Sequence, residues 1–391
     1  MTSVARNNLN FSNGTFSSLL QKVGFFPCKN IICPETGKFL MVPTKTSLQV
    51  LCYLSTTIIH FGILCLLINL AKTEDYKNVT EFSMDFFKNG GGFNSKYDFN
   101  VFESLTTTFH IFHFIIFYQL FAARIKMCEV FNEVQEYSKQ NCLLAKSQLI
   151  NDFRKYFYKL AFINFGWPIF IIGFTINIVE QFSTSIFIWL PFIFSYLFWI
   201  FWCLAPMYSF HLYFHQITFT LHLWIQSAKE NQDFEDYPKM VFCLNMWTST
   251  ISKLIFWIFL FLILCSIIES YLLVAFFLSQ DGFSLATILL MIGYGFIGSL
   301  FLFLIHTYCK TSQIVTDSII ELKHRIIQSH LEEEDNQSNR TKMTKRIVFE
   351  LEQFHGFHGN GYFVLGKPLV TSIVATFATY LIILIEFKVS Q

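Results

Sequence analysis

Charge is what this sequence has least of. Only 14% of its 391 residues are Asp, Glu, Lys or Arg, whereas 53% are hydrophobic and the mean hydropathy is +0.46. Soluble domains carry about a quarter charged residues, so this composition excludes an ordinary soluble protein and predicts an integral membrane protein. The 28 basic and 27 acidic residues nearly cancel to a formal charge of +1. No general positive field is left to attract a nucleic acid, so we exclude nucleic acid as a partner.

The motifs of common enzymes and metal sites are also missing. The sequence has no glycine-rich phosphate loop, no nucleophile elbow and no zincin helix. Its ten Cys lack the short paired spacings of a zinc or redox site and imply no disulfide framework. His211, His215 and His222 share one helix face, but no carboxylate or thiol completes a metal site, so we interpret them as helix packing. We expect no enzyme activity, no metal and no cofactor.

Long hydrophobic runs, in contrast, are abundant. A membrane-spanning helix needs about 20 mostly apolar residues, because the hydrocarbon core is roughly 30 Å thick. Seven segments qualify: 48–70, 102–122, 157–179, 184–208, 254–278, 283–307 and 369–387. Very short turns join the third to the fourth and the fifth to the sixth, so each of these pairs forms a helical hairpin. The sequence predicts an all-α integral membrane protein with seven transmembrane helices.

The connecting segments set the orientation. By the positive-inside rule, Lys and Arg collect on the cytosolic side of a membrane. On the side of the N-terminus the segments hold 22 Lys and Arg residues, and those on the opposite side hold five. The N-terminus is therefore expected in the cytosol and the C-terminus outside the cell. With this orientation Asn78 lies in the first external loop, between the first two spans, and is the glycosylation candidate.

Cytosolic helices are expected to extend the spans. After the sixth span, Ile and Leu recur at helical spacing as far as residue 331, and the fourth span continues to about residue 227. Residues 336–342 are polar and are predicted to form a flexible linker, followed by a short helix before the Gly-rich turn at 355–361. The predicted regions are a cytosolic N-terminal segment (1–47), helices one to six with the ligand region (48–307), cytosolic anchor helices with the linker (308–368), and the seventh helix with a short external tail (369–391).

The last span carries the most specific motif. Thr379 and Tyr380 are followed by five hydrophobic residues and then by Glu386 and Phe387. This run resembles the signature of insect gustatory receptors, in which Thr-Tyr, five hydrophobic residues and Gln-Phe follow one another. The similarity covers residues 361–387. On these residues the chain resembles members of the insect chemoreceptor superfamily.

That resemblance implies a function. Gustatory receptors are odorant receptor-like, ligand-gated, non-selective cation channels of the plasma membrane, in which a small-molecule tastant opens a pore lined by the seventh helix of four subunits. The resemblance implies a homotetramer, or a heterotetramer with related subunits, surrounded by membrane lipid in chemosensory neurons or internal nutrient-sensing cells. Leu381 stands where the sugar-receptor branch has an acidic residue, which argues against a sugar ligand.

Three residues of the last span are candidates for the pore. The family's constriction matches Ile383 and Phe387, and Glu386 lies on the same helix face as both. Four copies of the two apolar residues would form a neck that gates by dewetting, and four carboxylates would form a ring that favours cations. The alternative for Glu386 is a place in water at the external boundary.

The external halves of the other spans supply candidates for a ligand pocket. Among these, Glu269 is the strongest, because an acid deep in an apolar run is costly without a partner. His110 and His113 share a face and invite either a pH-sensing role or ordinary packing. The full set is Glu103, Thr107, His110, His113, Asn177, Trp189, Tyr196, Glu269, Tyr271 and Tyr294.

Two other functions compete with the channel. A G-protein-coupled-type receptor would need the opposite orientation, and its last span would typically hold an Asn-Pro-x-x-Tyr motif, whereas this chain has no Pro after Pro368. A secondary transporter would show internal repeats and broken helices. Pro168, Pro191 and Pro206 could kink spans three and four, but no repeat accompanies them. The channel interpretation explains more of the sequence than either alternative.

Overall fold

The protein was analysed as a computed structural model. It describes residues 28–32, 39–43, 58, 96–141, 186–231, 237–278, 285–332 and 338–389, with eight single positions between 158 and 176. Those eight positions are all helical, as expected for the third span. Apart from residue 58, the expected first span lies outside the described residues, as do Asn78 and Asn177.

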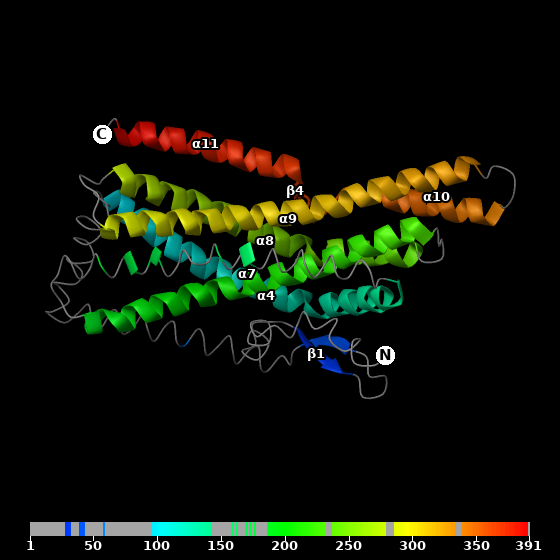
Figure 1. Ribbon diagram of the computed structural model, residues 1–391, viewed down its shortest axis with the longest axis horizontal. Coiled ribbons are helices and arrows are strands. Elements are labelled where there is room, and N and C mark those ends of the chain that lie inside the picture. Colours follow the sequence, from blue (N-terminus) through cyan, green and yellow to red (C-terminus); the bar gives the residue numbers. More distant parts are fainter. Residues whose placement is uncertain are drawn as a thin grey trace.

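Four long helices run the length of an elongated bundle (Figure 1). They are α4 (Lys96–Asn141), α7 (Ile186–Asn231), α8 (Tyr237–Leu278) and α9 (Leu285–Glu332). The shortest has 42 residues and the longest 48. At 1.5 Å per residue such helices are about 60–70 Å long, twice the thickness of a hydrocarbon core. Each helix therefore continues well beyond a membrane, as predicted for the fourth and sixth spans.

Two of these helices correct the predicted loops. The α4 helix continues to Asn141, although a loop was expected from residue 123, and α8 begins at Tyr237 instead of residue 254. The reason is tertiary packing, because both extensions bury an apolar stripe between charged residues that lower the mean hydropathy. The stripes are Met127, Val130, Phe131 and Val134 on α4, and Met240, Val241, Leu244, Trp247 and Ile251 on α8.

A shorter helix, α10 (Ser338–Glu352), lies beside the last part of α9 (Figure 1). The prediction of a flexible linker over 336–342 is wrong from Ser338 onward, because the helix already begins there. Ile347 and Leu351 are buried, and Glu352 forms an ion pair with Lys323 of α9 at 2.8 Å. These contacts stabilise a helix whose first turns have little apolar content of their own.

Two small β-hairpins add to the helices. Strand β3 (His358–Gly359) lies within the expected Gly-rich turn, and β4 (Phe363–Val364) follows that turn. The two strands pair antiparallel and lead into α11 (Lys367–Val389). Strands β1 (Cys28–Ile32) and β2 (Phe39–Pro43) pair antiparallel in the N-terminal segment, for which no strand was predicted. This hairpin packs against α4, where the fully buried Cys28 thiol lies 3.6 Å from the carbonyl of Arg124.

The helices have the composition of membrane spans. Among the described residues, three helices are long and apolar enough to cross a bilayer, and the first part of α11 is a shorter apolar helix. The three stretches are Ile111–Val134, Tyr237–Val274 and Ile288–Gln328. The protein is thus an all-α, multi-pass membrane protein.

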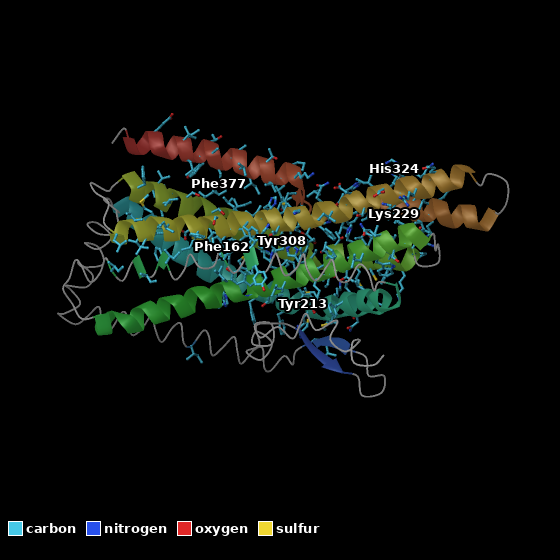
Figure 2. The ribbon with its side chains drawn as sticks, in the orientation of Figure 1. Phe162, Tyr213, Lys229, Tyr308, His324 and Phe377 are labelled. Atoms are coloured by element: carbon cyan, nitrogen blue, oxygen red, sulfur yellow. The ribbon has the colours of Figure 1, made fainter. Side chains whose placement is uncertain are left out.

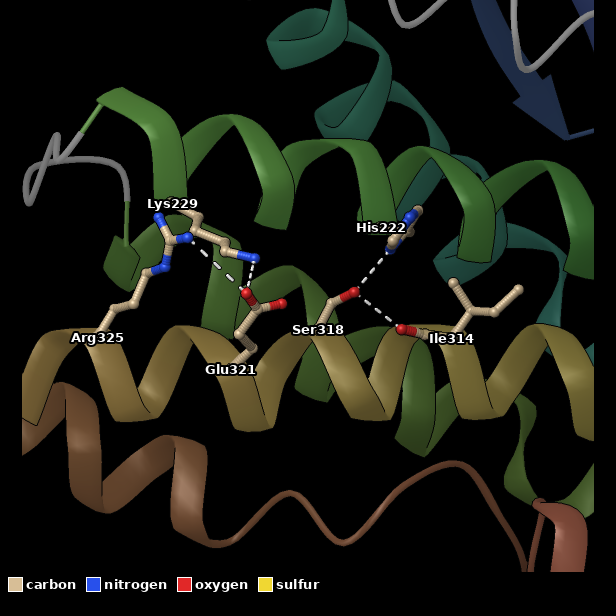
Figure 3. A network of polar contacts seen from close by, with 6 residues as sticks. All are labelled: His222, Lys229, Ile314, Ser318, Glu321 and Arg325. Atoms are coloured by element: carbon tan, nitrogen blue, oxygen red, sulfur yellow. Dashed lines mark hydrogen bonds and ion pairs between the residues drawn. The ribbon is translucent and has the colours of Figure 1, made fainter.

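A polar seam joins α7 to α9 near the end of the bundle that carries α10 (Figure 3). The two helices run parallel, and their contacts step along both chains in order. From α7 the seam has His211, His215, His222 and Lys229, and from α9 it has Tyr308, Thr311, Ser318 and Glu321. The last three α7 residues are spaced by seven, as in a coiled coil, where buried polar pairs fix the register of two helices.

The hydrogen bonds of the seam define which ring nitrogen of His222 carries a proton. The Ser318 hydroxyl donates to the Ile314 carbonyl at 2.8 Å, so its single proton is used within α9. His222 Nδ1 lies 2.9 Å from the same oxygen and must therefore be the donor of that bond. Beyond it, Lys229 forms an ion pair with Glu321, and Arg325 lies 3.8 Å from the same carboxylate. The histidines thus pack helices, as predicted.

Burial keeps these imidazoles neutral. Desolvation lowers the pKa of His215 to about 3. Desolvation, and then the neighbouring His215, lowers the pKa of His211 well below its ordinary value. For His222 the pKa is also lowered, first by burial and then by the charge of Lys229. Below about pH 6.5 these histidines therefore bind protons in the unfolded chain but not in the folded protein. The free energy of unfolding decreases as the pH falls.

We expect the thermal unfolding temperature of the purified protein to drop between about pH 7.5 and about pH 5.5. His215→Gln keeps a side chain that can bond to Thr311 but cannot be protonated. It should remove about 1.4 kcal/mol of this loss per pH unit below about pH 6.5. Scanning fluorimetry in detergent measures the slope. Equal slopes for wild type and His215→Gln would contradict this role for burial.

Candidate functional site

The α11 helix touches the rest of the bundle with one face only. It lies along one side of the bundle and turns back beside the first half of α9 (Figure 1). Within the described side chains of α11, Ile373 and Phe377 are the buried ones, at 7% and 8% exposure. They are four residues apart, which places both on one side of a helix, and Figure 2 shows Phe377 between α11 and the bundle. The other sides of α11 have no cover from the described part of the chain.

The uncovered side of α11 holds most of the residues predicted for the pore. Nine residues separate Phe377 from Glu386, which places the carboxylate about 180° around the helix from the buried ring. Glu386 is exposed, and Ile383 is 42% exposed. Thr379 and Tyr380 of the family motif are exposed as well, Tyr380 at 46%. Phe387 belongs to α11, but its side chain is outside the described set.

A row of hydroxyls continues this side toward the start of the helix. Each hydroxyl donates its proton to the carbonyl four residues earlier in α11. The pairs are Thr371 with Lys367 at 3.2 Å, Ser372 with Pro368 at 3.0 Å, Thr376 with Ser372 at 2.8 Å, and Thr379 with Ala375 at 3.0 Å. Because the protons are used within the helix, the oxygen lone pairs remain to accept bonds from water or to contact a cation.

Four of the ligand-pocket candidates have described side chains. Glu269 is buried at 4% exposure on α8, and its Oε2 has no hydrogen-bond partner among the described residues. It lies eight residues beyond Phe261, whose ring is 5.6 Å from Phe112 of α4, so it is about 12 Å nearer the end where α11 finishes. A buried oxygen without a partner is costly, which supports a role for Glu269 beyond packing.

The aromatic candidates are packed. Tyr294 of α9 is buried, and its ring meets that of Phe170 edge to face at 4.9 Å. Gly293 permits this approach, since a Cβ there would lie 2.6 Å from the Cα of Phe170. His113 of α4 is buried and stacks on Phe117 at 6.4 Å, which favours packing over pH sensing. Tyr271 is half-buried on α8.

Of the six remaining pocket candidates, Asn177 lies outside the described residues and the other five are located by their backbone alone. Glu103, Thr107 and His110 belong to α4, and Trp189 and Tyr196 belong to α7. All five lie in the parts of those helices near the end where α11 finishes, and their side chains are outside the described set.

Sequence reasoning missed the residues that hold the start of α11. Ser312 and Gln313 of α9 bond to the chain on either side of Gly366. The sequence gives little sign of their role, because two polar residues are ordinary within an amphipathic helix. No group of three potential metal ligands occurs among the described side chains.

Comparison with solved structures identifies the architecture. The chain is similar to the insect olfactory receptor OR5 of Machilis hrabei in complex with eugenol, with a TM-score of 0.63 at 14% identity, over 95% of this chain and 98% of that one. A second structure of that receptor gives a TM-score of 0.58 at 13% identity, over 94% and 98%. No protein-family model and no curated protein matches the chain. At this identity the likeness shows that the chain shares the fold of these receptor structures.

The unpaired carboxyl of Glu269 leads to a stability prediction. Replacing a buried ionisable group by an apolar one of similar size is often neutral or stabilising. We expect Glu269→Leu to unfold at the wild-type temperature or above it. Glu321→Leu is the matched control and should unfold at a lower temperature, because Glu321 is paired with Lys229. A clear loss of stability in Glu269→Leu would mean that this carboxyl supports the fold and is not held for a ligand.

Proposed function

We propose that this protein is a ligand-gated, non-selective cation channel of the insect chemoreceptor superfamily, of the gustatory receptor type. The observation that carries the proposal is the uncovered side of α11, where Glu386 lies opposite the buried Phe377. A carboxylate on the lipid-facing side of a spanning helix is costly, whereas one that lines water in a pore is not. The fold and the Thr379-Tyr380 motif support the same conclusion.

Such a pore requires more than one chain. One α11 helix cannot enclose an ion path, but four copies around an axis can, with the hydroxyl row and Glu386 turned inward. We propose a tetramer of identical chains or of this chain with related subunits, with seven spans each and the N-terminus in the cytosol. The excess of Lys and Arg on the α10 end agrees with that orientation, and Asn78 would then be open to glycosylation.

The proposed stimulus is a small-molecule tastant. The eugenol complex shows that a receptor of this fold binds a small organic molecule. In this chain the pocket candidates, with Glu269 foremost, belong to the end of the bundle where α11 finishes. We propose that a ligand there opens the pore in the plasma membrane of a chemosensory or nutrient-sensing cell. Whole-cell recording across a panel of tastants tests this directly, and an absence of any evoked cation current from surface-expressed protein would refute it.

Gating is proposed to depend on an apolar neck at Ile383 and Phe387. A small polar side chain there should hydrate the neck and lower the barrier to ions, so Ile383→Ser and Phe387→Ser should pass current without ligand. Val374→Ser is the matched control, because Val374 is exposed about 180° around α11 from Ile383. Silent Ile383→Ser and Phe387→Ser channels that reach the surface and respond normally would exclude this neck as the gate.

Cation conductance and block by divalent cations are proposed to depend on Glu386. Glu386→Gln restores the residue of the family motif and removes up to four charges from the mouth of a tetramer. We expect ligand sensitivity to stay near wild type, while cation conductance or block by divalent cations decreases. Single-channel recording in solutions with and without calcium measures both. If neither property changes, Glu386 lies outside the ion path.

A further inference from the structure

The chain between α10 and α11 is held by both neighbouring long helices. This connection, residues 353–366, contains the β3–β4 hairpin. On the α8 side, Asn360 donates its backbone N–H to the Ser252 carbonyl at 3.1 Å. The rings of Tyr362 and Phe363 lie 5.1 Å from Phe256 and 5.3 Å from Phe259.

On the α9 side, two polar side chains form hydrogen bonds with the chain where α11 begins. Ser312 donates its hydroxyl to the Leu365 carbonyl at 2.9 Å. Gln313 accepts the backbone N–H of Lys367 on its Oε1 at 3.4 Å, while its Nε2 donates to Asp317 at 2.7 Å. The Asp317 bond orients the amide, so that its oxygen points at the first residue of α11.

The Ser312 bond is unusual for a hydroxyl within a helix. Ser299, Thr307, Thr316 and Ser318 of the same α9 helix all donate to carbonyls three or four residues earlier in α9. Ser312 is fully buried and instead donates to a residue 53 positions later. It therefore binds the connection to α9.

Glycine makes the close approach possible. A Cβ at Gly366 would lie 2.8 Å from Gln313 Oε1, so a larger residue would displace the Gln313 amide from the N–H that it accepts. The first N–H groups of a helix need acceptors from outside it. Pro368 has no N–H to satisfy. The N–H of Lys367, the first residue of α11, is accepted by Gln313 of α9.

Further along α11, the described contacts with the bundle are of a different kind. Ile373 and Phe377 pack by apolar contact, and the described side-chain hydrogen bonds beyond Lys367 stay within α11 itself. Apolar contacts tolerate sliding and tilting, whereas hydrogen bonds of fixed geometry do not. The start of α11 is thus its fixed point.

We propose that Ser312 and Gln313 are positioning residues for the pore, which hold the start of α11 on α9 and so keep the channel closed at rest. This inference rests on the proposed channel function. Weakening the α9 side should therefore release α11 and raise the open fraction without ligand.

Hydrogen exchange tests the attachment independently of channel activity. In the purified full-length protein, Ser312→Ala and Gln313→Leu should speed deuterium uptake in a peptide covering residues 363–372. The loss of one hydrogen bond corresponds to about a fivefold change in a local opening equilibrium. The matched controls are Ser299→Ala, on the same helix, and Gln353→Leu, at the exposed start of the connection. Unchanged uptake in both test variants would overturn the attachment.

Resting current tests the functional part. At equal surface expression, Ser312→Ala and Gln313→Leu should carry about fivefold more current without ligand than wild type, measured as the inward current lost when sodium is replaced by N-methyl-D-glucamine. The controls should match wild type. Faster exchange with an unchanged or smaller resting current would overturn the positioning role. If wild type responds to no tastant and no variant carries current, the proposed channel function fails, whereas the exchange result still decides the attachment.

Discussion

The α11 helix has an apolar sequence but buries only one side among the described residues of its own chain. Ile373 and Phe377 supply that buried side, whereas Thr379 and Glu386 face away from it. A bilayer accepts bare apolar residues at little cost, and it accepts back-bonded hydroxyls too, but it does not accept a carboxylate without water or a partner. The uncovered side of α11 therefore requires water, further subunits or both. A shared aqueous pore meets all these conditions at once, and the proposed assembly follows from this constraint.

The α9 helix connects this pore element to the rest of the bundle. Along one face it forms the polar seam with α7, where His222 and Lys229, seven residues apart, meet Ser318 and Glu321 (Figure 3). Directly after the seam residue Thr311, Ser312 bonds to the connection that starts α11. The seam fixes α9 in register with α7, because sliding by one residue would leave buried polar groups unpaired. A helix held in register on one side can transmit its movement to α11 on the other.

Much of this architecture could be predicted from the sequence, and the failures have a common cause. The spans that became α7, α9 and α11 are continuous apolar runs, so hydropathy located them within a few residues. The extension of α4 and the start of α8 were missed, because charged residues such as Lys126 and Lys239 interrupt an apolar stripe that only tertiary packing reveals. The β-hairpins were missed because two-residue strands and an isolated hairpin leave little pattern. At the site, the motif pointed to Ile383 and Glu386, but nothing local in the sequence links Ser312 to Leu365, 53 residues away.

Single-particle electron microscopy of the full-length protein in lipid nanodiscs tests the central claim most directly. The account predicts four chains around one axis with α11 innermost, and with Thr379 and Glu386 closer to that axis than Ile373 and Phe377. A monomer would contradict it, and so would an assembly in which the Glu386 side of α11 faces lipid.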